Sequence, residues 1–221
     1  MLLTLILDGM PEVTSFWYPA LLPGNAISVT SDGLVWTMDS LTVTTPGHGP
    51  GRCFIAREIQ RRARTIDDVV SYLGAHPSAG GFGYIIGDRS GRVVCVDAAA
   101  GQHGLSEVGA AGPLAWHTNH PRYFTDDNFP VSGDSASRGQ ILAGAAVPRP
   151  EPETAWFLRL LSGAPGPDGV RVDPRGEFPV ATICTFVASL TAGEAVILPR
   201  GGSPVAIGLA NLAAGIASAA G

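Results

Sequence analysis

Short apolar runs separated by turn residues dominate the first part of the chain. Residues 26–30 and 34–38 flank Ser31-Asp32-Gly33, where Asp-Gly supplies the positive φ values of a tight hairpin turn. Residues 84–87 and 93–97 flank a second turn of the sequence Asp-Arg-Ser-Gly. This pattern predicts two antiparallel hairpins.

Between the two hairpins the apolar period lengthens. Ile55, Ile59 and Ala63 recur every four residues, which is typical of one face of a helix. Thr65, followed three residues later by Asp68, resembles a capping box with aspartate in place of glutamate. Two consecutive helices are therefore predicted here.

Helical and strand patterns alternate again in the second half of the chain. Leu114–Thr118 is predicted as a short strand, and Ser135 as the N-cap of a helix. A further helix is predicted around Trp156–Leu160, and strands over Val180–Ser189 and Ala195–Leu198. Strands followed by helices and then strands indicate a layered α+β fold.

Composition narrows the range of functions. The 221 residues carry a net charge of −5, and all 14 basic residues are arginine. The absence of lysine excludes a phosphate-loop lysine, a Schiff-base lysine and a serine–lysine dyad. The acidic balance (pI about 5.4) argues against a nucleic-acid surface. One domain spanning residues 1–221 is expected, because no repeat or linker interrupts the chain.

The cysteines and the chain ends bear on location. Cys53, Cys95 and Cys184 are too widely spaced for a metal or redox motif, so they are predicted to be buried free thiols in a reducing compartment. Met1–Asp8 lacks the positive region of a signal peptide and is predicted as a strand. The Ala- and Gly-rich tail Val205–Ala220 is too weakly apolar for a membrane span. A cytoplasmic protein without a membrane partner is expected.

The densest polar cluster is His117-Thr118-Asn119-His120. As a metal site it is weak, because it offers two histidines without a third ligand nearby. If it continues a strand, His117 and His120 point to opposite faces. A serine triad is also poorly supported, because Ser135 and Ser137 have no neighbouring base in sequence and there is no Gly-x-Ser-x-Gly elbow. No metal or cofactor is predicted.

The order of the segments is more specific than any single motif. In sequence the segments are Pro23-Gly24, Ser31-Asp32-Gly33-Leu34, Asp39-Ser40-Leu41, Gly49-Pro50-Gly51-Arg52, the helix over 55–64, the hairpin over 84–97, His117-Thr118-Asn119-His120, Ser135–Arg138, Thr182-Ile183-Cys184 and Gly202-Ser203-Pro204. This succession, over about Leu5 to Pro204, resembles the acyl-coenzyme A:6-aminopenicillanic-acid acyltransferase family, also called the isopenicillin N acyltransferase or carcinine hydrolase group. These N-terminal-nucleophile enzymes are relatives of bile-salt and penicillin V hydrolases.

The resemblance implies a four-layer αββα sandwich, amide chemistry and roles for particular residues. Asn119 matches the asparagine that helps to stabilise the oxyanion. Arg138 follows the serine-rich segment where bile-salt hydrolases carry an active-site arginine, and with His117 it is expected to contact substrate. The family's nucleophile is a cysteine freed at the N-terminus, with its own α-amino group as the base. By resemblance this cysteine lies upstream of Met1, because the sequence contains no Gly-Cys dipeptide.

Two positions depart from the family pattern. Asp39 stands where relatives have an asparagine that contributes to the oxyanion site, so it is a candidate catalytic position. A carboxylate there repels the oxyanion unless it is protonated or turned away. Thr185, expected to line the substrate site, replaces the arginine of the penicillin enzyme, so recognition of penicillin-type substrates is not supported.

Two functions from different classes follow. The favoured one is an amide hydrolase or N-acyltransferase acting on a small-molecule amide or acyl donor. The alternative is a catalytically inactive, truncated family member that acts as a binding or scaffold protein. The reading frame upstream of Met1 distinguishes them, because a Cys followed about fifteen to twenty residues later by Asn-x-Asp restores the enzyme. A metal hydrolase built on His117 and His120 is a third, weaker hypothesis.

Overall fold

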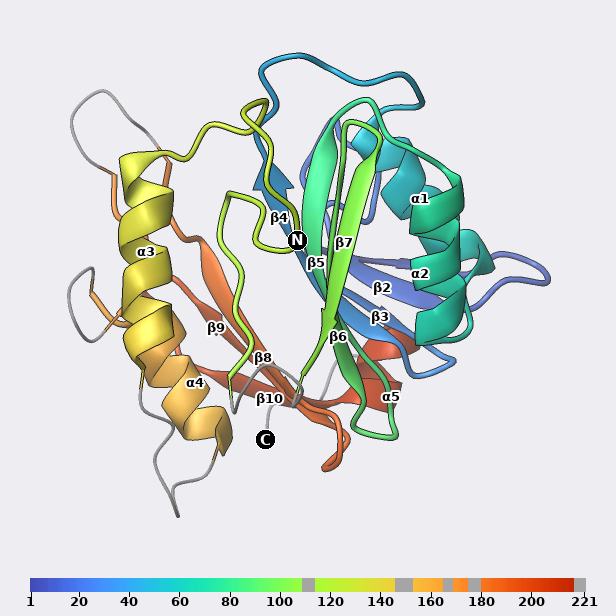
Figure 1. Ribbon diagram of the computed structural model, residues 1–221. Coiled ribbons are helices and arrows are strands. Elements are labelled where there is room, and N and C mark those ends of the chain that lie inside the picture. The colour runs from blue at the N-terminus through green and yellow to red at the C-terminus, as the bar shows by residue number, and fades with distance from the viewer. Residues whose placement is uncertain (109–113, 146–152, 165–168, 175–179, 217–221) are drawn as a thin grey trace.

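A seven-stranded antiparallel sheet forms the centre of the protein (Figure 1). The computed structural model describes residues 1–108, 114–145, 153–164, 169–174 and 180–216. Neighbouring strands of this sheet are also consecutive in sequence. They are β1 (Leu2–Leu5), β2 (Val13–Phe16), β3 (Ser28–Thr30), β4 (Val35–Leu41), β5 (Gly81–Gly87), β6 (Val93–Ala99) and β7 (Gln102–Glu107).

A smaller antiparallel sheet has the order β10-β9-β8. Its strands are β8 (Cys184–Ser189), β9 (Glu194–Pro199) and β10 (Val205–Gly208). The helices are α1 (Arg52–Arg62), α2 (Ile66–Ala75), α3 (Gly133–Gly144), α4 (Glu153–Ser162) and α5 (Leu209–Ala213). In Figure 1, α1 and α2 lie beside the large sheet, whereas α3 and α4 lie on the side of the small sheet. The result is a mixed α/β fold with antiparallel sheets.

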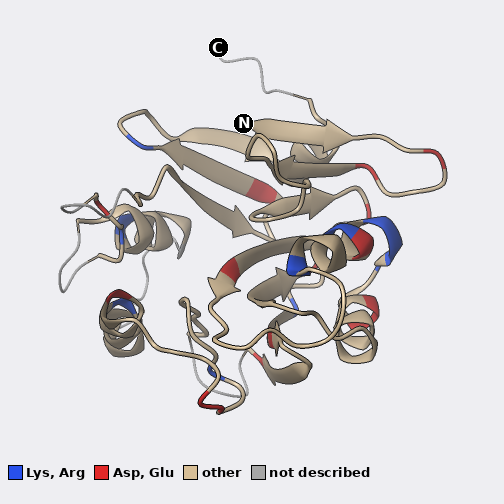
Figure 2. Ribbon diagram, turned by 90° about the horizontal axis from the view of Figure 1, so that it is seen from above, with Lys and Arg blue, Asp and Glu red and all other residues tan. Residues whose placement is uncertain are grey.

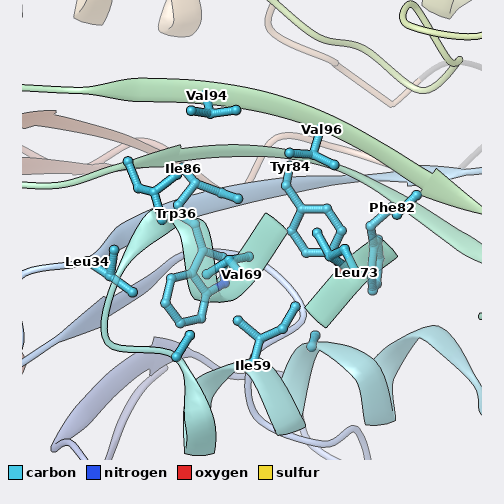
Figure 3. Close-up of a cluster of buried hydrophobic side chains, with 14 of the residues drawn as sticks. Leu34, Trp36, Ile59, Val69, Leu73, Phe82, Tyr84, Ile86, Val94 and Val96 are labelled. Carbon is cyan, nitrogen blue, oxygen red and sulfur yellow. The ribbon is translucent and has the colours of Figure 1, made fainter. Parts of the chain in front are cut away.

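The main hydrophobic core lies between the large sheet and the helix pair α1 and α2. Because side chains alternate along a strand, every second residue of β4, β5 and β6 points toward these helices. Trp36, Tyr84 and Val96 are examples, and they meet Ile59 and Val69 of the helices in Figure 3. This packing fixes which face of each strand points the other way.

The opposite face of the large sheet packs partly against the small sheet and α5. Val29 and Val35 form a second apolar cluster with Ala195, Leu212 and Ala213. Both faces of the large sheet therefore carry apolar contacts, to α1 and α2 on one side and to the small sheet and α5 on the other.

Several sequence predictions are confirmed. Both hairpins form, as β3–β4 and β5–β6, and the first eight residues contain β1. The helix predicted from Ile55 onward is α1, and Thr65 with Asp68 closes a complete capping box at the start of α2. Among the described residues, no helix is both long and apolar enough to cross a membrane. Residues 217–220 of the tail lie outside the described part.

Other predictions are wrong. Leu114–Thr118 is no strand, and only an isolated bridge pairs Thr118 with His120. Its apolar residues, Leu114 to Trp116, are half-buried without pairing to another strand, and a short apolar run does not distinguish partial burial from strand pairing. Ser132, and not Ser135, caps α3, because the hydroxyl of Ser135 is bonded to other side chains.

The strand predicted over Val180–Ser189 is shorter than expected, and two of the thiols are less buried than expected. Strand β8 begins at Cys184, so Val180 to Ile183 stay outside it; the amide of Val172 donates to the hydroxyl of Thr182 instead. Cys95 is buried, whereas Cys53 and Cys184 are half-buried. All three thiols are free, as predicted.

Candidate active site

Charged residues are rare in the sheets. Within the described strands only four residues are charged, and Glu107 and Glu194 lie at strand ends. Figure 2 shows how little red or blue the strands carry. The remaining two, Asp39 of β4 and Asp97 of β6, lie in one cross-strand row on either side of Gly83. A pair of mid-strand carboxylates on one row calls for a counter-charge.

His117 supplies that counter-charge. Its ring lies directly over Gly83, where an added Cβ would stand 2.1 Å from the ring. Nε2 of His117 lies 2.5 Å from Oδ1 of Asp97, and Nδ1 lies 3.5 Å from Oδ2 of Asp39. The second distance is within ion-pair range but too long for a hydrogen bond, and Nδ1 has no hydrogen-bond partner among the described residues.

Burial and charge act in opposite directions on His117. Its side chain and that of Asp97 are fully buried, while Asp39 is 39% exposed. Burial lowers the pKa of His117, but the carboxylates of Asp39 and Asp97 outweigh it and raise this pKa to about 9. His117 is therefore an imidazolium at neutral pH.

Asp97 is held by the chain that follows His117. Its Oδ2 accepts hydrogen bonds from the backbone amides of Arg122, at 2.6 Å, and Tyr123, at 2.8 Å. The guanidinium of Arg122 stacks over Trp116 and donates to its carbonyl oxygen. These contacts close the turn from Trp116 to Tyr123 and fix how it presents His117 and Asn119.

Asn119 is anchored on two sides. Its Nδ2 donates to the carbonyl oxygen of Ser40 at 3.0 Å, and its Oδ1 accepts from Nη2 of Arg138 at 2.7 Å. Nε of Arg138 is in turn paired with Asp134 at 2.9 Å, one turn earlier on α3. Because a guanidinium only donates, the orientation of the amide is set, and one N–H of Asn119 has no acceptor among the residues that the structure describes.

His120 has a different set of partners. Its Nδ1 lies 2.8 Å from Oγ of Ser135 and 3.1 Å from Oγ1 of Thr118. Burial, followed by the positive charges of His117 and neighbouring arginines, lowers the pKa of His120, so it is neutral. Among the described residues, no group of three or more His, Cys, Asp or Glu side chains is arranged to hold a metal ion.

An apolar cavity of about 310 Å³ lies next to the charged row. Its floor includes Val35 and Thr37 of β4 and Ile85 of β5. Thr37 and Asp39 share one face of β4, so the cavity floor and the charged row are about 7 Å apart. The far wall comes from the second sheet and α4, through residues such as Val187 and Phe157.

The structure brings together four of the five predicted site residues. Asp39 faces His117, Asn119 is bonded to the residue after Asp39, and Arg138 is bonded to Asn119. Thr185 lies in β8, where it lines a separate pocket that also includes Arg171.

Sequence reasoning missed Asp97 and Gly83. Asp97 is the last residue of the run predicted as a simple hairpin strand over 93–97, and Gly83 lies just before the run predicted over 84–87. The available signal was a charge in the apolar run Val93–Ala99, because an aspartate inside a buried strand needs a partner. Gly83 gave a weaker signal, since a glycine inside a strand often marks a close approach.

Comparison with known proteins identifies the family. The sequence profile of acyl-coenzyme A:6-aminopenicillanic acid acyl-transferase matches residues 3–195. The chain belongs to this family. No curated protein matches the sequence. The resemblance inferred from the order of motifs in the acyl-transferase family is thus confirmed.

Solved structures give a more distant likeness. Two variants of the conjugated bile acid hydrolase from Clostridium perfringens are similar to this chain, with identities of 10% and 12% and TM-scores of 0.48 and 0.45. Each alignment covers 90% of this chain and 77% of the hydrolase chain.

Proposed function

We propose that the chain carries the oxyanion-binding side of an amide hydrolase or N-acyltransferase site. The observation that carries this proposal is the fixed amide of Asn119. Its oxygen is held by Arg138 and one N–H by Ser40, and the other N–H, which has no acceptor among the described residues, can donate to a reacting carbonyl. Such a preorganised neutral donor stabilises the charge that develops on a tetrahedral intermediate.

Arg138 serves this site as a positioning residue. If the amide of Asn119 were reversed, its oxygen would face the developing oxyanion and repel it. The guanidinium of Arg138 opposes that reversal, because it binds only the oxygen end of the amide. The ion pair with Asp134 keeps the guanidinium in place on α3.

The nucleophile in this proposal is an N-terminal cysteine outside the 221 residues, as the family pattern implies. The three cysteines of the chain are poor substitutes, because each lies within a helix or strand. Burial also raises the pKa of the Cys95 and Cys184 thiols, which lowers their thiolate fraction at neutral pH. The α-amino group of a terminal cysteine needs no histidine to accept the thiol proton.

The substrate we propose is a small amide with an apolar acyl group. The cavity beside the charged row is lined almost entirely by apolar side chains and ends about 7 Å from Asp39. Leu114 and Ala115 line this cavity, and the same segment continues into His117 and Asn119. An acyl chain in the cavity would therefore point its carbonyl toward Asn119.

A four-layer αββα sandwich is the fold we propose for this site. The large sheet packs against α1 and α2 on one face and partly against the small sheet on the other. Helix α4 contacts β8 and β9 of the small sheet. This order of layers would place the cavity and the charged row between the two sheets.

Amine release from N-acyl amides tests the proposal. The protein is expressed with the residues that precede Met1 in its reading frame, and amides with acetyl to decanoyl groups are supplied. Turnover that rises with acyl length and is abolished by thiol alkylation is the expected result. Arg138→Met should lower kcat about tenfold or more, since it frees the Asn119 amide to reverse.

The matched control for Arg138→Met is Arg62→Met. Arg62 is also a helix arginine paired with an acid four residues earlier, Glu58, but far along the chain from Asn119. Unchanged kinetics are expected for the control. Equal kinetics for both variants, or turnover that alkylation leaves intact, would reject the proposed site.

One observation favours a binding protein as the second candidate. Asp39 places a partly exposed carboxylate where relatives have an asparagine, and this charge opposes an oxyanion. A binding protein would take up an N-decanoyl amide, measurable by titration calorimetry, without releasing amine. Release of amine would exclude this candidate.

A further inference from the structure

Asp39 lies beside the atoms that hold the proposed oxyanion donor. The carbonyl of Ser40 accepts the hydrogen bond from Asn119, and Asp39 is the preceding residue of β4. An unpaired carboxylate at this position would oppose negative charge on a reacting carbonyl. The proposed site therefore needs a positively charged group that offsets the charge of the Asp39 carboxylate and holds this side chain away from the reacting carbonyl.

The imidazole ring of His117 is held in one position. Its ring lies so close to Gly83 that a Cβ on this residue would clash with it, and its side chain is fully buried. Nε2 is paired with Asp97. Asp97 is itself fixed by two backbone amides. Nδ1 is thereby directed at Asp39, 3.5 Å away.

Each ring nitrogen of His117 faces a carboxylate oxygen. A neutral imidazole has one N–H and one lone pair, so one nitrogen would turn a lone pair toward a carboxylate. Only the imidazolium presents N–H groups to both Asp39 and Asp97. The pKa of about 9 for His117 agrees with this geometry.

We infer that His117 is a positioning residue whose imidazolium holds the Asp39 carboxylate to one side and offsets part of its charge, so that an acid is tolerated beside the oxyanion site. This inference rests on the proposed function. Asp97 is required as well, because its buried negative charge keeps His117 protonated. Without Asp97, the partly exposed Asp39 alone would have to offset the burial of the ring.

The surrounding charges define the expected pH dependence. His117 is faced by Asp39 from β4 and Asp97 from β6, and its positive charge lowers the pKa of His120, on which Arg122 of the turn and Arg138 of α3 act in the same direction. Deprotonation of His117 removes the positive charge that faces Asp39 and so exposes the charge of this carboxylate. Activity is then expected to fall as the pH rises through about 9.

Two measurements on the intact chain test the inference. Nitrogen-15 NMR of histidine-labelled protein follows the titration of His117 directly and needs no catalytic activity. A titration near pH 9 is expected, moving to lower pH in Asp39→Asn and further in Asp97→Asn. The exposed His48 supplies the reference signal, which neither substitution should shift. Titration of His117 near its ordinary value, or no response to Asp39→Asn, would overturn the inference.

Kinetics supply the second test. His117→Gln should lower kcat about tenfold or more, and adding Asp39→Asn in the same chain should restore most of it, because the charge to be neutralised is gone. Asp39→Asn alone should change kcat little at pH 7 and remove the fall near pH 9. His48→Gln is the matched control and should leave kcat unchanged.

The outcomes separate the two proposals. A double variant no more active than His117→Gln would contradict the neutralising role. If His117→Gln does not fold, the conservative Asp39→Asn variant still decides through its pH profile and NMR titration. Absence of any turnover, with the NMR titration as expected, would reject the proposed function and leave the pairing of Asp39 with His117 standing.

Discussion

The two faces of the seven-stranded sheet follow opposite rules. Toward α1 and α2, β5 presents only large apolar or aromatic side chains, such as Phe82, Tyr84 and Ile86. Toward the other side, the same strand presents three glycines, among them Gly83, and one large side chain, Ile85. The first face is filled by its own side chains, whereas the second leaves space that other segments occupy. Stability is therefore expected to depend mostly on the first face and chemistry on the second.

The largest expected effect is on the helix-facing side. Trp36→Ala should lower the free energy of unfolding by about 3–5 kcal/mol, because it leaves a large cavity in the main core. Trp36→Phe should cost much less, since the indole N–H is buried without a hydrogen-bond partner among the described residues. Urea unfolding measures both. Equal losses for the two variants would contradict this account of the core.

The next largest effect is the pH dependence of stability that His117 causes on the second face of the sheet. The folded-state pKa of His117 is raised from 6.5 to about 9. A raised pKa stabilises the fold fully below about pH 6.5, and the contribution, on the order of 3 kcal/mol, is lost as pH rises through about 9. Unfolding measured between pH 6 and 10 should therefore show a steeper decline in the wild type than in His117→Gln. Parallel declines would mean that His117 is neutral in the folded protein.

Gly83→Ala tests the second face of the sheet by adding a methyl group to it. The new methyl would stand 2.1 Å from the His117 ring, so the ring must move away from Asp39 and Asp97. A loss of about 1–3 kcal/mol is expected by overpacking. The His117 titration should also return toward its ordinary range. Gly144→Ala, where a Cβ meets nothing within 4 Å, is the control and should not be destabilising.

The smallest effect concerns the cavity between the sheets. Ala188→Phe adds a ring to its wall and should lower kcat/KM for a decanoyl amide about tenfold, while an acetyl amide is unaffected. Steady-state kinetics with both amides measure the difference. The same loss for both acyl groups would show that the cavity is not the acyl site.

The sequence was sufficient for local structure because local chemistry decides it. Asp32-Gly33 marks a hairpin turn, and Thr65 with Asp68 marks a helix start, whatever the surroundings. The strand predicted over Leu114–Thr118 is wrong because its apolar residues are half-buried by packing without a strand partner, which no local pattern reveals.

The site was only partly predictable for a related reason. Asn119, Arg138 and Asp39 came from the order of motifs shared with the family. The row formed by Asp97 and Gly83 depends on strand register across β4, β5 and β6, so it requires the folded sheet. The register also explains how Asp39 is accommodated, which was the main difficulty raised by the sequence.

The role of Asn119 as oxyanion donor is the central claim, and one kinetic comparison tests it most directly. Asn119→Ala and the exposed control Asn211→Ala are measured with the same N-acyl amide, in protein that includes the residues preceding Met1. Asn119→Ala should lower kcat about 100-fold or more with little change in KM, because the hydrogen bond strengthens mainly in the transition state. Asn211→Ala should behave as wild type. Equal kcat values for the two variants would contradict the account.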